Sequence, residues 1–215
     1  MSEQTHEHHN TRQRILQAAT EVFVENGFNK TTVREICSRA DVNVAAVNYH
    51  FGSKENLYKE VCIHALGISA AGDNRFPDPA APPETQLERF IHTLLTEILD
   101  QQTRVVAGKI MAWEMNEPSG VFDFIIDDII KPSHERLCAI VAAILGPRAD
   151  EATVKHCVFS IIGQCLHYRY GRQVIMRLYP SLQFASETVE RLARHITRFS
   201  LAALRRIAAE ITTPE

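Results

Sequence analysis

The run TTVREICSRADVNVAAVNYHFGSKENL, residues 31–57, decides the fold of this chain. Thr32 and Glu35 have the spacing of an N-cap and the third helical residue, which predicts a helix that begins at Val33. In this pairing the Thr32 hydroxyl accepts from the Glu35 amide, and the Glu35 carboxylate accepts from the Thr32 amide. The apolar residues of this helix recur three and four positions apart, so they share one face.

A tight turn and two further helix starts follow within the same run. Asp41 tolerates the left-handed backbone that such a turn requires, and Asn43 is a good N-cap for a helix over about 44–51. Gly52 ends that helix, and Ser53 caps a fourth one that starts at Lys54. Two short helices joined by so short a turn are typical of a helix-turn-helix, a unit that reads DNA.

The run resembles the TetR family of bacterial transcriptional regulators, whose usual string is roughly A-G-V-S-x-x-x-(L/V)-Y-x-(H/Y)-F-x-x-K-x-x-L. The chain matches this string at Ala40, Val42, Val47, His50, Phe51, Lys54 and Leu57. It departs from the string at Asp41, Asn43 and Asn48. Upstream, the family's first two helices are matched by Ile15, Ala18, Ala19, Phe23, Gly27, Phe28, Thr31, Thr32, Val33 and Ile36.

Three later pieces resemble the smaller CecR-type branch of that family. They are WEMNEP at 113–118, IKP at 130–132 and GQCLHYRYG at 163–171. The resemblance implies an N-terminal three-helix DNA-binding domain, followed by a larger C-terminal helical domain for ligand binding and dimerisation.

Helical periodicity extends along the rest of the chain, which predicts an all-α protein. A first helix over about 11–26 ends at Gly27. Later helices are predicted over 85–101, 104–116, 121–145 with a bend or a break at Pro132, 152–176 and 186–210. We expect a DNA-binding domain over residues 1–59, with a disordered arm over 1–9. We expect an effector-binding and dimerisation domain over 60–215, with the fourth helix reaching about Ala70 and a Pro-rich linker at 72–83.

Composition limits the class of protein. A chain of 215 residues with 45% hydrophobic content can bury a substantial core, which excludes a disordered or fibrous protein. No apolar stretch is long enough to span a membrane, and the polar start lacks the apolar segment of a signal peptide, so we expect a cytoplasmic protein. The net charge is −3, yet basic residues outnumber acidic ones between Lys30 and Lys59, which suits a local DNA-binding surface.

The cysteines and histidines do not form a recognisable reactive site. The five cysteines are scattered through helical patterns without a C-x-x-C pair, which argues against a disulfide framework. Cys157 and Cys165 are eight residues apart, and core packing is favoured over a redox switch. His156 and His167 lack the spacing that would place two metal ligands on one helix face. We therefore expect no enzyme activity, no metal and no cofactor.

The predicted recognition helix, residues 44–50, contains neither Lys nor Arg. The commonest specific contact, a bidentate Arg or Lys on guanine, is thus absent from it, and we expect A·T contacts to dominate unless Arg34 or Arg39 reaches a guanine. Asn48 suits a bidentate contact to adenine. Three small apolar residues suit thymine methyl groups: Val44, Ala45 and Ala46.

Four residues suit phosphate contacts, because hydroxyl groups, an imidazole and a cation at a helix start all bind anionic oxygen. They are Thr32, Tyr49, His50 and Lys54. Packing between the first and fourth helices is the alternative for Tyr49 and His50.

Polar side chains embedded in apolar helices are candidates for effector binding. They are Trp113, Glu114 and Asn116 in one predicted helix, and Gln164, His167 and Arg169 in another. Glu114 and Arg169 either contact the ligand or pair in a buried salt bridge. We expect a small, partly hydrophobic effector.

The last two long helices carry apolar stripes. The stripe of the final helix is Val189, Leu192, Ile196, Phe199, Ala203 and Ile207, which predicts core positions. The resemblance implies that these helices pair with their copies in a homodimer. Further apolar positions suit that second buried face: Ile162, Leu166, Leu201 and Leu204.

The expected function is sequence-specific binding to double-stranded DNA at a palindromic operator. The resemblance implies a repressor that a small-molecule effector releases from the operator. The alternative is a protein of the same fold that tethers a protein partner to the chromosome.

Overall fold

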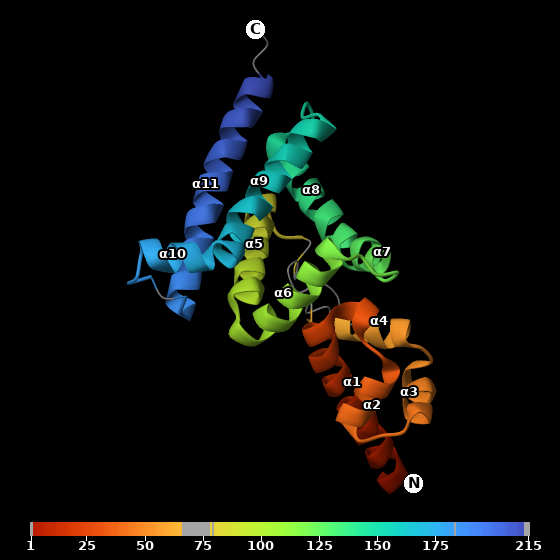
Figure 1. Cartoon of the computed structure of the whole chain (residues 1–215). Helices are drawn as coiled ribbons and strands as arrows, with labels where there is room; N and C mark the ends of the chain where they lie inside the picture. The colour runs from red at the N-terminus through yellow and green to blue at the C-terminus, as the bar shows by residue number, and fades with distance from the viewer. Residues whose placement is uncertain (1, 66–77, 79, 183, 213–215) are drawn as a thin grey trace. The chain divides into compact units, whose positions relative to one another are not determined.

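The computed structural model describes residues 2–65, 78, 80–182 and 184–212, with side chains described from residue 10 onward and outside 101–104. Every regular element within these ranges is helical, which confirms the predicted all-α class (Figure 1). The chain forms two compact units. Unit 1 comprises Met1–Ala70 and Gln102–Ile130, and unit 2 comprises Ala71–Gln101 and Lys131–Glu215.

Unit 1 is built on four N-terminal helices, to which a later segment of the chain returns. The helices are α1 (Ser2–Lys30), α2 (Val33–Ala40), α3 (Val44–Phe51) and α4 (Lys54–Ala65), followed after the gap by α6 (Gln101–Asn116), α7 (Phe122–Phe124) and the π-helical turn η1 (Ile125–Ile130). Ile110 of α6 and Ile125 of η1 join the apolar core of α1 to α4. The predicted bounds of α2 and α3 are confirmed. The predicted end of the fourth helix and most of the predicted linker lie outside the described residues.

The first helix starts earlier than predicted. Helical backbone begins at Ser2, although the sequence predicted a disordered arm over residues 1–9. Neither Pro nor Gly occurs in residues 2–26, so nothing local interrupts the helix there. The helical conformation is broken at Gly27, with φ of 72° and ψ of 175°, which confirms the predicted stop.

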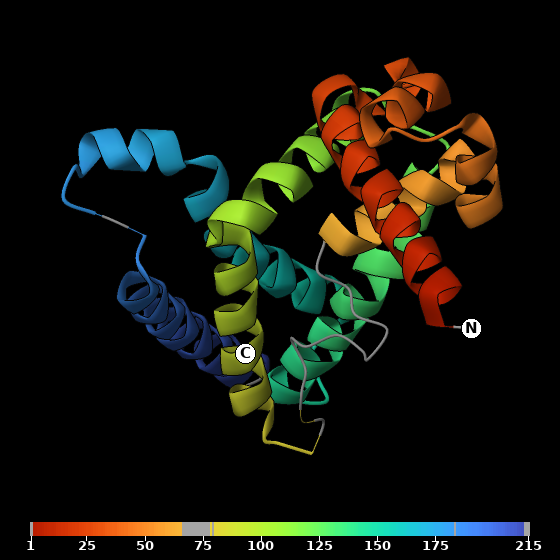
Figure 2. The same ribbon diagram turned by 90° about the horizontal axis from the view of Figure 1, so that it is seen from below.

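Unit 2 has a separate apolar core. Its helices are α5 (Pro83–Leu99), α8 (Lys131–Leu145), α9 (Glu151–Tyr170), α10 (Arg172–Leu178) and α11 (Ser186–Thr212). Helix α11 packs against α5 and α8, and α9 against α8 and α5 (Figure 2). Among the described helices, none has both the length and the apolar character that crossing a membrane requires.

The helix predicted over 121–145 is interrupted just before Pro132. The turn η1 ends at Ile130 and α8 begins at Lys131, so the widened π-helical turn lies directly before the proline. Pro132 has no N–H to donate, and its ring would clash with the carbonyl four residues earlier in a regular α-helix. The wider turn relieves that clash.

The single helix predicted over 152–176 is wrong. The chain instead forms α9 and α10, separated at Gly171. A Cβ at Gly171 would lie 2.7 Å from the His167 carbonyl oxygen, so only glycine fits this junction. Apolar periodicity continues through the break, which is why the sequence pattern concealed it.

The predicted stripe on α11 is only partly right. Val189 and Ile196 are buried, whereas Phe199 is 61% exposed. Ala203 is also exposed, and Ser200 and Leu204 face the core instead. The buried face of α11 therefore includes the small residues Ala193 and Ser200 and leaves Phe199 outside it.

Burial disfavours the thiolate form of both cysteines considered for a redox role. Burial raises the pKa of Cys165 to about 12, and burial also raises the pKa of the half-buried Cys157 thiol. Since the thiolate is the reactive form, both environments disfavour redox exchange. Core packing, the interpretation favoured by the sequence, fits these environments.

We predict that Gly27→Ala lowers the free energy of unfolding by about 1–3 kcal/mol, because an alanine there is strained in φ. The Cβ of that alanine would also lie 2.9 Å from the Trp113 ring. Urea denaturation measures the change. Gly120→Ala is the matched control, because its Cβ meets nothing within 4 Å. Equal stability of the two variants would contradict the prediction.

Candidate nucleic-acid interface

The helix-turn-helix is held by three local hydrogen bonds of the expected kind. The Thr32 hydroxyl accepts from the Glu35 amide at 3.2 Å, and the Asn43 side chain accepts from the Ala46 amide at 3.0 Å. Asp41 has φ of 51°, the left-handed conformation predicted for the turn. The Ser53 hydroxyl accepts from the Asn56 amide at 3.1 Å, which confirms the predicted cap of α4.

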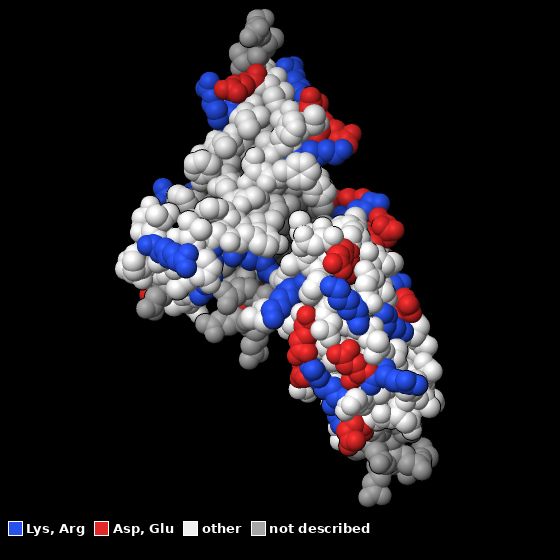
Figure 3. Space-filling view, in the orientation of Figure 1, with Lys and Arg blue, Asp and Glu red and all other residues white. Residues whose placement is uncertain are grey.

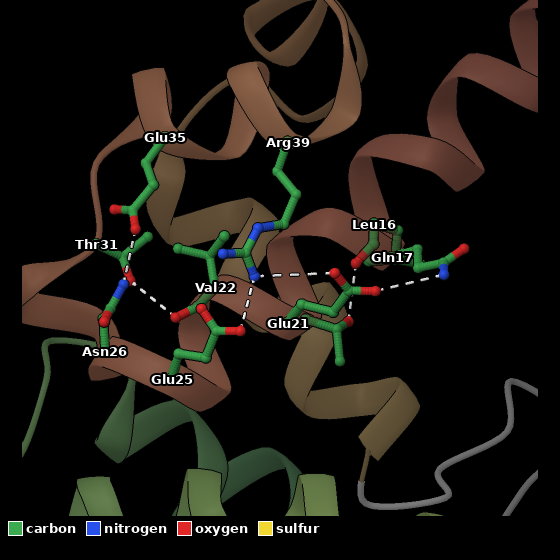
Figure 4. Close-up of polar contacts among 10 residues, drawn as sticks. Leu16, Gln17, Glu21, Val22, Glu25, Asn26, Thr31, Glu35 and Arg39 are labelled. Atoms are coloured by element: carbon green, nitrogen blue, oxygen red, sulfur yellow. Dashed lines mark hydrogen bonds and ion pairs between the residues drawn. The ribbon is translucent and has the colours of Figure 1, made fainter.

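Glu35 does not complete the predicted reciprocal cap. Its carboxylate accepts instead from the side-chain amide of Asn26 on α1 at 2.8 Å (Figure 4). This bond ties the start of α2 to the last regular turn of α1. The predicted donor to Glu35, the Thr32 amide, is wrong because a local motif does not take account of a donor from another helix.

Arg14 fixes the turn from α1, a role that the sequence pattern did not indicate. Its guanidinium donates to the carbonyl oxygens of Ala40 at 2.6 Å and Asp41 at 3.0 Å. These are carbonyls at the end of α2, which a helix leaves without intrahelical partners. The turn is therefore positioned by α1 as well as by its own residues.

Helix α3 has one buried and one exposed face. Val47 is 0% exposed and Phe51 6% exposed, and both belong to the core of unit 1. Tyr49 lies on the opposite face and is 74% exposed, and Val44, in the first turn, is 43% exposed. The exposed candidates for base and phosphate contacts thus lie together on one surface: Val44, Ala45, Asn48 and Tyr49.

The remaining α3 candidates lie at the edge of that surface. Ala46 is half-buried and packs against the core of unit 1. The half-buried His50 ring meets the Tyr49 ring edge-on, with 5.1 Å between centroids. The alternative of packing between α1 and α4 is wrong for Tyr49, because most of its side chain is exposed.

Two of the candidate cations have partners within unit 1. Arg39 forms ion pairs with Glu25 at 2.8 Å and Glu21 at 3.8 Å (Figure 4). The hydrogen bond from Arg39 lowers the pKa of Glu25. Lys54 donates to the carbonyl oxygens of Phe28 and Thr31, both at 3.0 Å, and lies 4.1 Å from the centroid of the Phe28 ring.

Arg34 and Thr32 are exposed at the start of α2. Within the described part of the chain, no ion pair holds Arg34. Figure 3 shows Lys and Arg side chains intermixed with Asp and Glu over unit 1. Among the cations Arg34, Arg39 and Lys54, Arg34 is therefore the best placed to add positive charge at a DNA backbone.

The effector candidates of α6 have structural partners in unit 1. The Trp113 ring covers Gly27, and its Nε1 donates to the Val24 carbonyl at 3.2 Å. Glu114 is 1% exposed and accepts from the Tyr58 hydroxyl at 2.8 Å and the Ser119 amide at 2.9 Å. Both Glu114 oxygens therefore have partners within unit 1.

Tyr58 is a buried residue whose role the sequence did not reveal. It lies on α4 with 0% exposure, and its hydroxyl donates to Glu114 of α6. Burial, followed by the nearby Cys62 and Glu114, raises the pKa of Tyr58. The neutral phenol therefore remains a donor to Glu114, and this bond joins α4 to α6.

The other effector candidates are dispersed. Asn116 is exposed and donates to the Ala112 carbonyl of its own helix at 2.7 Å. In unit 2, Gln164 donates to the Ser200 hydroxyl at 3.4 Å, and Arg169 lies 5.5 Å from the Tyr170 ring centroid. His167 is exposed on the same helix. The candidates are therefore divided between the two units.

A hollow on α11 involves four residues that the sequence did not single out, together with Phe199 of the predicted stripe. It is lined by Arg191, Arg194, His195, Arg198 and Phe199. Four of these side chains are basic or titratable, and they follow helical spacing along one exposed face of α11. Counting charges along α11 would have indicated this face.

Two family models match the chain. The model described as "Bacterial regulatory proteins, tetR family" matches residues 15–61. The model described as "HTH-type transcriptional dual regulator CecR, C-terminal domain" matches residues 83–204. Together they cover both units.

Individual relatives agree with these models. The chain is 28% identical over 198 residues to the HTH-type transcriptional dual regulator CecR of Shigella flexneri, covering 86% of this chain and 87% of that protein. It is 38% identical over 86 residues to the HTH-type transcriptional repressor Rv3405c of Mycobacterium tuberculosis, covering 40% and 45% of the two chains.

Solved structures share the fold. A putative fatty acid metabolism regulator of Clostridium perfringens matches with a TM-score of 0.66 at 22% identity, covering 88% of this chain and 97% of that one. HlyIIR, a hemolysin II transcriptional regulator, matches with a TM-score of 0.59 at 24% identity, covering 88% and 98%.

We predict different effects from removing the two arginines of α2. Arg34→Ala should weaken binding to every duplex alike and reduce the slope of log affinity against log salt by about 1 for each half-site, because one phosphate contact is lost. Arg39→Ala should leave the slope unchanged, because Glu25 already neutralises Arg39. Fluorescence anisotropy across a salt series measures both. Equal slope changes in the two variants would contradict the assignment.

Proposed function

We propose a ligand-released repressor as the function of this chain, which belongs to the TetR family of bacterial transcriptional regulators and has a C-terminal domain of the CecR type. The chain is a DNA-binding regulator by that membership. Release by an effector, and repression as the sign of regulation, are the parts that we add. A dimer that covers a promoter excludes polymerase, and an effector that alters half-site spacing removes the dimer.

The observation that carries the DNA-binding part of the proposal is that α3 has one buried face and one exposed face. Its buried face anchors it to unit 1, while Val44, Ala45, Asn48 and Tyr49 are exposed together. We assign Asn48 to an adenine and the small residues at 44–46 to thymine methyl groups. A face of this size and chemistry fits the major groove.

Phosphate contacts follow from the groups around α3. We assign them to the exposed Thr32, Arg34 and Tyr49, with His50 at the edge of the surface. Lys54 has one N–H left after its two carbonyl contacts, so a phosphate contact from it would supplement a structural role.

We infer a homodimer from the apolar residues exposed on the outer face of unit 2. Phe159 of α9 is 59% exposed and Phe199 of α11 is 61% exposed. Figure 3 shows a surface largely without charged side chains over these two helices. Ile162, Leu166 and Leu201 are half-buried beside it, whereas the predicted Leu204 lies in the core of its own unit. Two copies that meet on this face would form a four-helix interface.

The candidate effector-binding residues fall into two groups. Trp113 and Glu114 already support α1 and α4, so a ligand that engages them would act directly on the unit that carries α3. Asn116, Gln164, His167 and Arg169 remain candidates for direct contact with a small, partly hydrophobic ligand. We keep residues 1–59 as the DNA-binding domain, although residues 102–130 of the expected effector domain pack with its helices. We place the protein in the cytoplasm with its DNA.

Selection of the purified protein against a random duplex library tests the proposal. We predict a palindromic site with A·T pairs under α3, and we predict that Asn48→Ala costs about 1–3 kcal/mol at one base pair and little elsewhere. Anisotropy on the winning site and on single-base variants measures this pattern. An equal loss on every sequence would remove Asn48 from base reading.

Genome-wide occupancy separates regulation from tethering. A few promoter sites support a regulator. Dozens of sites dispersed outside promoters would contradict it in favour of a chromosomal tether.

A further inference from the structure

Helix α10 and its flanks leave an unusual amount of apolar side chain uncovered. Of the seven residues of α10, only Ile175 is buried. Five large apolar or aromatic side chains within ten consecutive residues are 40–66% exposed: Tyr170 (62%), Val174 (58%), Met176 (40%), Leu178 (66%) and Tyr179 (64%). An exposed patch of this kind marks an interaction surface.

The geometry of α10 concentrates part of this surface into a ridge. Val174 and Leu178 are four residues apart and therefore lie on one side of the helix. Ile175 is buried where α10 packs against α9. Figures 1 and 2 show α10 extending to the side of α9 and α11 within unit 2. In both views no other described helix of unit 2 lies over it, which agrees with the exposure of Val174 and Leu178.

The ridge is continuous with the proposed dimer face. Tyr170 is the last residue of α9, and Phe159 lies three turns earlier on the same helix. A partner that covers the outer face of α9 would reach the start of α10 without a break in apolar surface.

The area that a dimer needs favours a second copy as the occupant. The exposed parts of Phe159 and Phe199 supply about 250 Å². A stable interface buries about 800 Å² on each partner. The five side chains around α10 supply roughly 500 Å² more, which brings the apolar surface to the required size.

The main competing occupant is an anionic membrane surface. Residues 152–186 contain no Asp or Glu, and Arg169, Arg172 and Arg177 accompany the apolar residues. Yet Arg172 lies 4.5 Å from the Phe184 ring centroid and Arg169 lies 5.5 Å from that of Tyr170, so two of the three guanidinium groups cover aromatic rings of their own chain. This arrangement favours a protein surface over lipid.

We propose that α10 is a clasp in the homodimer, with the Val174 and Leu178 ridge packed on the second copy of the chain. The inference rests on the proposed dimer and extends it. The clasp adds apolar area that the α9 and α11 face does not supply by itself. The clasp begins directly after Gly171, where a Cβ would lie 2.7 Å from the His167 carbonyl oxygen.

The test compares dimer dissociation constants by sedimentation equilibrium. The full-length wild type is compared with the double variant Val174→Ser, Leu178→Ser. Met115→Ser is the matched control, because Met115 is 68% exposed in unit 1 and outside the ridge. Far-UV circular dichroism confirms that each protein is folded. We expect the double variant to weaken the dimer by at least about tenfold and the control to match the wild type.

The outcomes separate this inference from the proposed function. A wild type that stays monomeric at micromolar concentration overturns the dimer and the clasp together. A wild-type dimer that the double variant matches in affinity overturns the clasp alone. A second assay measures binding to vesicles of phosphatidylcholine and phosphatidylglycerol in equal parts. If the wild type binds them, and the double variant loses this binding while its dimer is unaffected, the ridge would be assigned to a membrane surface instead.

Discussion

The shortness of α3 is the constraint on which the structure of unit 1 depends. A helix of eight residues is marginal in water by itself, because nucleation costs more than so few hydrogen bonds return. Its stability must come from Val47 and Phe51, which are buried in the core of α1 and α4. The same two residues fix which side of α3 faces outward. The exposure of Asn48 and Tyr49 is therefore a consequence of core packing.

That core reaches beyond the N-terminal helices. The buried Glu114 of α6 accepts from Tyr58 of α4, and Trp113 covers Gly27 where α1 breaks. A carboxylate so deeply buried is tolerated only with donors in place, so this contact strongly favours one arrangement of α4 against α6. Residues 102–130 thus belong physically with the DNA-binding helices. In the proposed mechanism, an effector signal would enter unit 1 through these residues.

The sequence predicted the parts of the fold that depend on local chemistry. The caps Thr32, Asn43 and Ser53, the left-handed Asp41 and the stop at Gly27 all follow from short-range rules, and all are confirmed. The failures depend on distant partners. Glu35 bonds Asn26, Arg39 pairs with α1, and Phe199 faces outward while Ser200 and Leu204 are buried against the rest of unit 2. The candidate contacts of α3 to DNA remain predictions, since exposure shows access and does not show a bound base.

Cleavage of operator DNA from α3 tests the central claim most directly. An iron chelate attached at Ala45→Cys, in a protein whose half-buried Cys138 and Cys157 are replaced by Ser, cuts DNA close to wherever α3 lies. The account predicts two symmetric clusters of cuts whose centres lie about one helical turn or a multiple of it apart, as a homodimer in successive major grooves requires. A single cluster would contradict the dimer. Uncut DNA bound by the labelled protein would contradict the assignment of α3 as the reading helix.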